Sequence, residues 1–150
     1  MRIAIGSDHI GVPLKRVIAA YLTEKGHDVR DFGAQDETRV DYPVFAQRVA
    51  KAVAGGCCEL GVLICGTGIG ISLAANKVEG IRAAVCSEAY SARMARAHND
   101  ANIIAFGARV VGEGAAVEIV DAFLKGTFEG GRHLERIRMM DAIPRGEDLG

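Results

Sequence analysis

Cys65 stands where an apolar run, residues 61–65, meets a glycine-rich stretch, residues 66–70. A thiol between a strand and a helix N-terminus is favoured as the thiolate, because the positive end of the helix dipole stabilises an anion. A thiolate in this place would act as a base or a nucleophile. A cysteine that ends a buried strand is also an ordinary core residue, so its position alone leaves both interpretations open.

The glycine loop itself is typical of a site for an anion. Gly66, Gly68 and Gly70 form a G-x-G-x-G pattern, and glycines between a strand and a helix let backbone amides approach a ligand closely. The pattern lacks the last glycine of the dinucleotide fingerprint, and no Gly-Lys-Ser/Thr follows as in a P-loop. Nucleotide binding is therefore disfavoured, while a plain structural turn remains an alternative.

Polar residues also follow other apolar runs. Asp8 and His9 come after the first run, and Arg109 comes shortly after the fifth, while His98 and Asn99 close a helical segment. Ligands of open parallel sheets bind beyond the carboxyl ends of the strands, which makes the residues after each strand candidates for a site. Each of them could equally be a helix cap or a surface group, and a histidine at a helix C-terminus is favoured by the dipole alone.

Two arginines near the C-terminus form a further candidate. Arg132 and Arg136 are spaced i, i+4 on one predicted helix, whose Leu134 and Ile137 point away from them. Two guanidinium groups in register can hold one phosphate through forked hydrogen bonds. A solvated charged face is the ordinary alternative.

The elements that must position these residues alternate along the chain. Continuous apolar runs interleaved with amphipathic segments predict a parallel sheet covered on both faces, a three-layer α/β/α sandwich with five strands. The predicted strands are residues 3–5, 29–32, 61–65, 81–86 and 102–106. The predicted helices are residues 12–22, 44–53, 71–77, 88–97, 113–125 and 132–143.

Length and composition bound what such a chain can do. With 150 residues, 49% of them hydrophobic, we expect one compact domain over residues 1–150 and a disordered polar tail at residues 145–150. The 18 basic residues against 19 acidic ones give a net charge of −1, which disfavours nucleic acid and anionic membrane as partners.

The four cysteines have neither a secretory signal before them nor the spacing of a metal site. We therefore expect reduced thiols, no metal ligand set and a cytoplasmic protein. The longest uncharged run, residues 60–76, contains four glycines and is predicted as strand, loop and helix, not as a membrane span.

Taken together, eight short motifs resemble the family of the type B ribose-5-phosphate isomerases, which also includes the galactose-6-phosphate isomerase subunits. They are SDH at 7–9, DYP at 41–43, LICGTGIGIS at 63–72, AANK at 74–77, IRA at 81–83, HND at 98–100, FGAR at 106–109 and GGRH at 130–133. The resemblance implies a Rossmann-like fold and interconversion of an aldose phosphate with its ketose phosphate. It also implies that neither a metal nor a nucleotide cofactor is needed.

The resemblance further implies a role for each site residue. Cys65 would be the base, assisted by a hydrogen bond from Thr67, and His98 would open the furanose ring. Backbone amides of the glycine loop would stabilise the enediolate. The implied catalytic residues are Cys65, Thr67 and His98; the substrate-binding residues are Asp8, His9, Tyr42, Gly66, Gly68, Ile69, Gly70 and Asn99; the phosphate-binding residues are His9, Arg109, Arg132 and Arg136.

Two further expectations come with the family. Some members lack the cysteine and use a glutamate six positions later, but Ile71 stands there in this chain, which assigns it to the cysteine branch. The family also implies a homodimer, or a tetramer built from it, in which each subunit completes the Cys65 pocket of the other. The residues that would reach into the pocket of the other subunit are His98, Asn99, Arg132 and Arg136.

The length of the sugar stays open at this point. We favour ribose 5-phosphate and ribulose 5-phosphate, because Asp8, His9 and the paired arginines match that subgroup. Allose 6-phosphate, galactose 6-phosphate and four-carbon sugar phosphates are the alternatives, since all present the same reacting end. A non-catalytic phosphate sensor is the alternative from another class, and it would have no use for the set of Cys65, Thr67 and His98.

Overall fold

The computed structural model describes residues 1–150, and its centre is a five-stranded, all-parallel sheet with the strand order β2-β1-β3-β5-β4. The strands are β1 (Arg2–Ser7), β2 (Asp28–Asp31), β3 (Leu60–Cys65), β4 (Ala83–Val85) and β5 (Ile103–Gly107). The helices are α1 (Val12–Glu24), α2 (Tyr42–Ala54), α3 (Ile69–Ala75), α4 (Ala89–Asn99), α5 (Glu113–Lys125), α6 (Arg132–Ala142) and the short 3₁₀ helix η1 (Ile143–Arg145).

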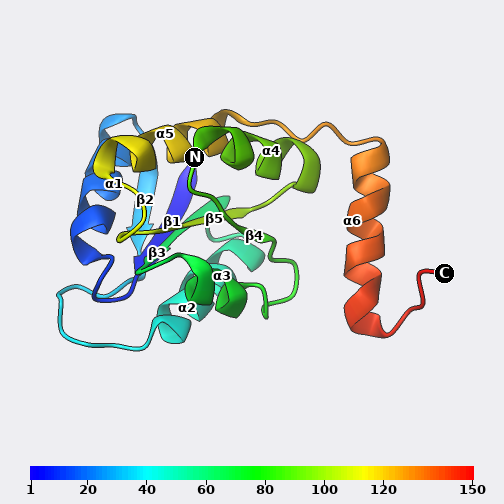
Figure 1. Cartoon of the computed structure of the whole chain (residues 1–150), viewed down its shortest axis with the longest axis horizontal. Coiled ribbons are helices and arrows are strands. Elements are labelled where there is room, and N and C mark those ends of the chain that lie inside the picture. Colours follow the sequence, from blue (N-terminus) through cyan, green and yellow to red (C-terminus); the bar gives the residue numbers. More distant parts are fainter.

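Helices cover both faces of the sheet (Figure 1). On one face α1, α4 and α5 pack against side chains such as Ile64 and Phe106, and on the other α2 and α3 pack against Leu63 and Ala105. Neighbouring residues of each strand point to opposite faces, so the covered central strands β3 and β5 are buried throughout, whereas the edge strand β2 is largely polar and exposed. The expected three-layer, five-stranded α/β sandwich is confirmed.

Most differences from the predicted elements lie at their ends. The third helix begins at Ile69, two residues earlier than expected, because Gly68 adopts a left-handed conformation (φ 80°) that ends the loop there. The fourth strand, expected over residues 81–86, is only three residues long, since Ile81 and Arg82 form a connection before it. Of the expected disordered tail, Arg145 belongs to η1, and residues 146–150 form no helix or strand.

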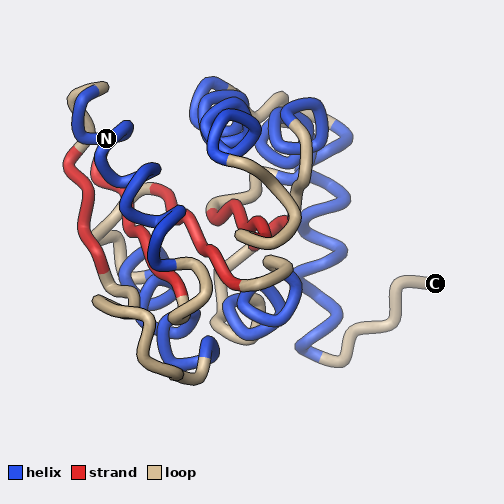
Figure 2. Tube along the Cα trace, turned by 60° about the vertical axis from the view of Figure 1, so that its left-hand side comes forward, coloured by secondary structure: helices blue, strands red, loops and turns tan.

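Helix α6 lies beside the sheet, at the end of the segment 126–131, and Figures 1 and 2 show it from two directions. Its buried residues are His133, Ile137 and Ala142, but Met139, Met140 and, directly after the helix, Ile143 leave large apolar surfaces exposed. A helix with this much uncovered apolar surface is typical of one that packs against another protein chain. No helix of the protein is long and apolar enough to cross a membrane.

Candidate active site

Cys65 ends β3 and is buried, with 4% of its surface exposed. Its Sγ accepts the backbone N–H of Gly68 at 3.1 Å. The left-handed Gly68 turns this N–H back toward the sulfur, and α3 begins at the next residue. A backbone N–H and the start of a helix are thus both directed at the sulfur.

The expected hydrogen bond from Thr67 to Cys65 is absent from this structure. Thr67 Oγ1 instead accepts the backbone N–H of Ile69 at 3.3 Å, and Gly68 is the donor to the sulfur. Thr67 thus closes a local turn ahead of α3, and it stays within two residues of the thiol. A hydroxyl that accepts one amide can still donate its own hydrogen, so the implied assistance from Thr67 stays a prediction.

The other thiols have environments that suit them less to base chemistry. Burial raises the pKa of Cys58, and it raises the pKa of Cys86 to about 11. Both therefore stay protonated at neutral pH. Cys57 is exposed, and its sulfur lies 3.1 Å from the guanidinium of Arg30, away from the glycine loop.

The glycine loop is packed tightly between β5 and α2. A Cβ added at Gly68 would lie 2.8 Å from the backbone of Phe106, and one at Gly70 would lie 2.6 Å from the ring of Tyr42. Tyr42 therefore lies directly against the loop, and its substrate-binding role stays a prediction. The backbone N–H of Arg109 donates to the carbonyl of Gly66 at 3.1 Å, which fixes the start of that side chain beside the loop.

Asp8 and His9 lie at the same edge of the sheet, because β1 is the direct neighbour of β3. The carboxylate of Asp8 is buried and accepts the backbone N–H groups of Ile10 (3.0 Å) and Gly11 (3.1 Å) through one oxygen. His9 accepts the N–H of Val40 at 3.3 Å through Nδ1. These contacts fix both side chains next to the glycine loop.

The remaining predicted residues lie elsewhere. Helix α4 runs back from the carboxyl end of β4, and only residues 100–102 separate it from the first residue of β5. His98 and Asn99 therefore lie at the edge of the sheet where the strands begin. Cys65 lies at the other edge, about 15 Å away along the strand direction at a rise of ~3.3 Å per residue. Arg132 and Arg136 belong to α6, whose His133 stacks on His98 at the same end of α4. One chain thus presents two groups of site residues at opposite edges.

A network of charges, which sequence reasoning missed, fixes the turn after α4. Asp100 adopts a left-handed conformation (φ 44°), and its carboxylate pairs with Arg82 (2.9 Å) and Arg96 (2.8 Å). Arg82 also donates to the carbonyls of Asn99 and Asp100. The neighbouring His98 and Asn99 are therefore held on a rigid turn. A non-glycine residue at positive φ is rare enough to suggest a functional constraint.

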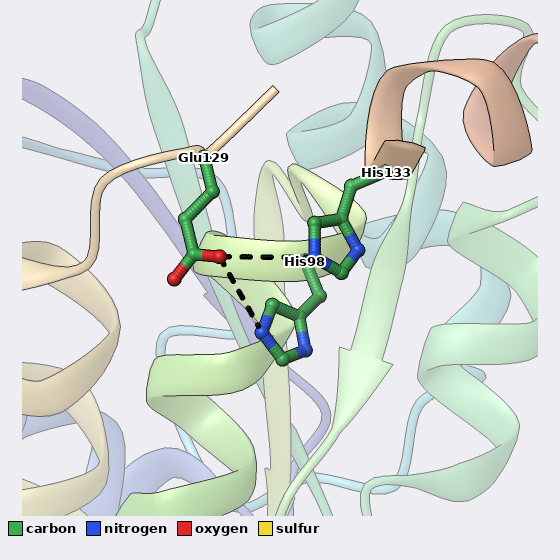
Figure 3. Close-up of side chains that lie close together, drawn as sticks. All are labelled: His98, Glu129 and His133. Carbon is green, nitrogen blue, oxygen red and sulfur yellow. Dashed lines mark ion pairs between the residues drawn. The ribbon is translucent and has the colours of Figure 1, made fainter. Parts of the chain in front are cut away.

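A second set that the sequence did not reveal surrounds His98 (Figure 3). The rings of His98 and His133 are stacked, with centroids 4.2 Å apart and planes 5° from parallel. Glu129 Oε2 lies 3.8 Å from Nε2 of His98 and 3.7 Å from Nε2 of His133. One ligand atom from each residue lies within 4.8 Å of the others. The lone pairs of two parallel rings do not converge on one point, so this arrangement is unsuited to a metal ion.

Comparison with known proteins identifies the class of protein that this fold and loop define, and the class is the sugar-phosphate isomerases. The chain belongs to the Ribose/Galactose Isomerase family, whose model matches residues 3–140. It is 56% identical to the ribose-5-phosphate isomerase B of Escherichia coli over 142 residues, which cover 95% of each chain. The resemblance expected from the eight sequence motifs is confirmed.

Solved structures of the same family have the same fold. A ribose-5-phosphate isomerase B of Clostridium thermocellum superposes with a TM-score of 0.96 at 55% identity, covering 97% of this chain and 99% of the other. A ribose-5-phosphate isomerase B of Mycoplasma genitalium, solved with bound ribulose 5-phosphate, has a TM-score of 0.91 at 41% identity, with 97% of each chain covered.

Proposed function

We propose that the protein interconverts ribose 5-phosphate and ribulose 5-phosphate, with Cys65 as the base. The observation that carries this proposal is the thiol of Cys65, held at the head of a glycine loop with a backbone N–H on its sulfur. Relatives that match nearly the whole chain support it. Among them are a ribose-5-phosphate isomerase B with 56% identity and one solved with bound ribulose 5-phosphate.

The chemistry needs a base, a site for an oxyanion and a phosphate site. The Cys65 thiolate removes the proton from carbon 2 of the open aldose, and the electron pair moves onto the carbonyl oxygen to give an enediolate. Amides of residues 66–70 stabilise the negative oxygen, as in an oxyanion hole. The proton of the hydroxyl on carbon 2 moves to the oxygen on carbon 1, carbon 2 becomes the carbonyl, and the thiol returns its proton to carbon 1, which yields the ketose. No step in this sequence requires a metal or a nucleotide cofactor.

The phosphate would bind between His9 and Arg109 of one chain and Arg132 and Arg136 of another. The two groups of residues lie at opposite edges of one chain, so a second copy is the simplest source of the missing half. A homodimer with a twofold axis would form two such composite sites. Met139 and Met140 of α6 and the following Ile143, which are exposed in the single chain, would be covered in that dimer.

The proposed role of Cys65 as a base also restricts the cellular compartment in which the protein is active. Catalysis by Cys65 requires a reduced cysteine, and all four cysteines of the chain are free. We therefore propose a reducing compartment such as the cytoplasm. We further propose that residues 1–150 act as one domain, since both halves of the sheet contribute to the loop edge.

The substrate assignment is tested by turnover of purified sugar phosphates of four, five and six carbons. We expect kcat/KM for ribose 5-phosphate to exceed that for allose 6-phosphate, galactose 6-phosphate and erythrose 4-phosphate by at least about tenfold. A larger kcat/KM for any of the other sugar phosphates would identify that compound as the substrate in place of ribose 5-phosphate. Tight binding without turnover of any of them would instead indicate a phosphate sensor.

Arg136→Ala tests the phosphate role of α6. Loss of one guanidinium that holds a phosphate should raise KM for ribose 5-phosphate by about 10–100-fold, with a much smaller effect on kcat. Arg138→Ala is the matched control, because Arg138 is an exposed arginine of the same helix, and it should leave KM within about twofold. Equal KM values for the two variants in steady-state assays would exclude Arg136 from the phosphate site.

A further inference from the structure

The cluster of His98, Glu129 and His133 has a feature that a purely structural contact does not explain. His133 is buried, with 7% of its surface exposed, and its Nε2 has no hydrogen-bond partner. Glu129 is well exposed, so it could extend into solvent, yet its carboxylate lies within 4 Å of both rings. A buried polar atom without a partner costs free energy, and such atoms are often found at functional sites.

The backbone holds this cluster in place. The N–H of Glu129 donates to the carbonyl of Ala97 at 3.0 Å, which ties the segment before α6 to the end of α4. Gly130 and Gly131 follow with φ of 66° and 54°, a conformation that side chains other than glycine rarely adopt. This turn brings the first residues of α6 back over α4 and places the ring of His133 on that of His98.

The charges around His133 keep its ring neutral. Burial lowers the pKa of His133, and the positive charges of His98, Arg132 and Arg136 lower it further, while Glu129 alone acts in the opposite direction. Two imidazolium rings 4.2 Å apart would also repel each other. The carboxylate of Glu129 is therefore available to the more exposed ring, that of His98.

We propose that Glu129 and His133 are positioning residues for His98, an inference that rests on the proposed isomerase function. Glu129 accepts the hydrogen on Nε2 of His98, and the ring of His133 holds that of His98 flat by stacking. The opposite nitrogen, Nδ1, is then directed to the sugar. The separation of 3.8 Å closes to a hydrogen bond by a small movement, as catalytic contacts often do when substrate binds.

The step that this arrangement serves is the opening of the furanose ring. The anomeric hydroxyl loses its proton to water, and its oxygen becomes the carbonyl as the bond between carbon 1 and the ring oxygen breaks. The ring oxygen keeps that electron pair and takes a proton from Nδ1 of the His98 imidazolium. Water reprotonates the imidazole, so that no proton is gained or lost overall. A carboxylate on Nε2 fixes the ring orientation for this transfer, as in other carboxylate–histidine pairs.

Glu129→Gln separates ring opening from the proton transfer at carbon. Incubation in D₂O gives two rates, net isomerisation of ribose 5-phosphate and solvent deuterium incorporation into ribulose 5-phosphate at carbon 1. Ribulose 5-phosphate is acyclic, so its exchange needs only Cys65 and the enediolate. We expect isomerisation to fall by about 10–100-fold and exchange to stay within about twofold of wild type. Glu135→Gln, the same change at an exposed position of α6, should alter neither.

Parallel loss of both rates in Glu129→Gln, or no loss of either, would overturn the positioning role. Failure of the wild-type protein to isomerise ribose 5-phosphate would instead overturn the proposed function, so the two failures are distinct. Loss of wild-type activity with EDTA, restored by Zn²⁺, would assign the cluster to a metal ion and also overturn the inference.

A pair of substitutions at His133 tests the stacking. His133→Phe keeps a flat ring without nitrogen atoms and should retain isomerisation within about threefold, whereas His133→Ala should lose about tenfold or more. Circular dichroism shows whether each variant is folded. Equal loss in two folded variants would mean that the ring nitrogens of His133 matter, not its face, and would contradict stacking as its role.

Discussion

Cys65→Ala should lower isomerisation of ribose 5-phosphate by about 10²–10⁴-fold while substrate binding stays nearly unchanged. In the proposed mechanism the thiol accepts the proton from carbon 2, and alanine removes the thiol with little change of backbone. Deuterium incorporation at carbon 1 of ribulose 5-phosphate should fall by the same factor, because exchange and isomerisation share the enediolate. This pattern differs from the one expected for Glu129→Gln, in which isomerisation falls and exchange is retained.

The chain supplies its own control for this substitution. Cys57 is an exposed thiol away from the loop, so Cys57→Ala should keep both rates within about twofold of wild type. Exchange at the wild-type rate in Cys65→Ala would exclude Cys65 as the base. Loss of binding as well, measured by calorimetry, would mean that the sulfur holds the loop through its contact with Gly68 and that its role is structural.

Mixing two inactive variants should restore activity if the active site is composite. Cys65→Ala and His98→Asn each remove one half of the site, and the halves lie at opposite edges of the chain. A mixed dimer of the two combines an intact Cys65 with an intact His98 in one of its two sites. After joint unfolding and refolding at equal amounts, about half of the dimers are mixed, so about a quarter of wild-type activity should return.

The matched control for this mixing uses two variants of the same half. Asp8→Asn and Cys65→Ala both alter the loop edge, so each site of their mixed dimer contains one defect and no activity should return. Activity in this control, or none with the pair of Cys65→Ala and His98→Asn, would contradict a site shared between subunits. The measurement is the turnover of ribose 5-phosphate at a fixed total protein concentration.

The sheet and the loop edge could be predicted from the sequence, because both depend on local pattern. Apolar runs that end in glycine gave the strands, and the rule that ligands bind at the carboxyl ends placed Asp8 and Cys65 together. The division into two groups could be predicted only through the family resemblance. Periodicity places His98 at the end of a helix, but it says nothing of a second chain that could bring this residue to Cys65.

What the sequence analysis missed depends on contacts between distant residues. Lys15 would be expected at the surface as a charged residue of an amphipathic helix, yet it is buried and bonds Asp31 at 2.6 Å and the carbonyl of Ala34 at 2.5 Å. Glu129 was likewise overlooked, because its neighbours on α4 lie some thirty positions earlier in the chain. Neither partner is visible until the tertiary fold is known.

If sites are shared between subunits as proposed, helix α6 would make the activity depend on protein concentration. In that proposal a single folded chain would hold the thiol base at one edge of the sheet and the acid and two arginines at the other, so it would be complete as a fold but incomplete as a catalyst. Activity per chain would then follow the fraction of chains that are paired, a matter of mass action. Oxidation of the exposed Met139 and Met140 could loosen α6 alone. Separation of the two subunits would then inactivate both composite sites without unfolding either sheet.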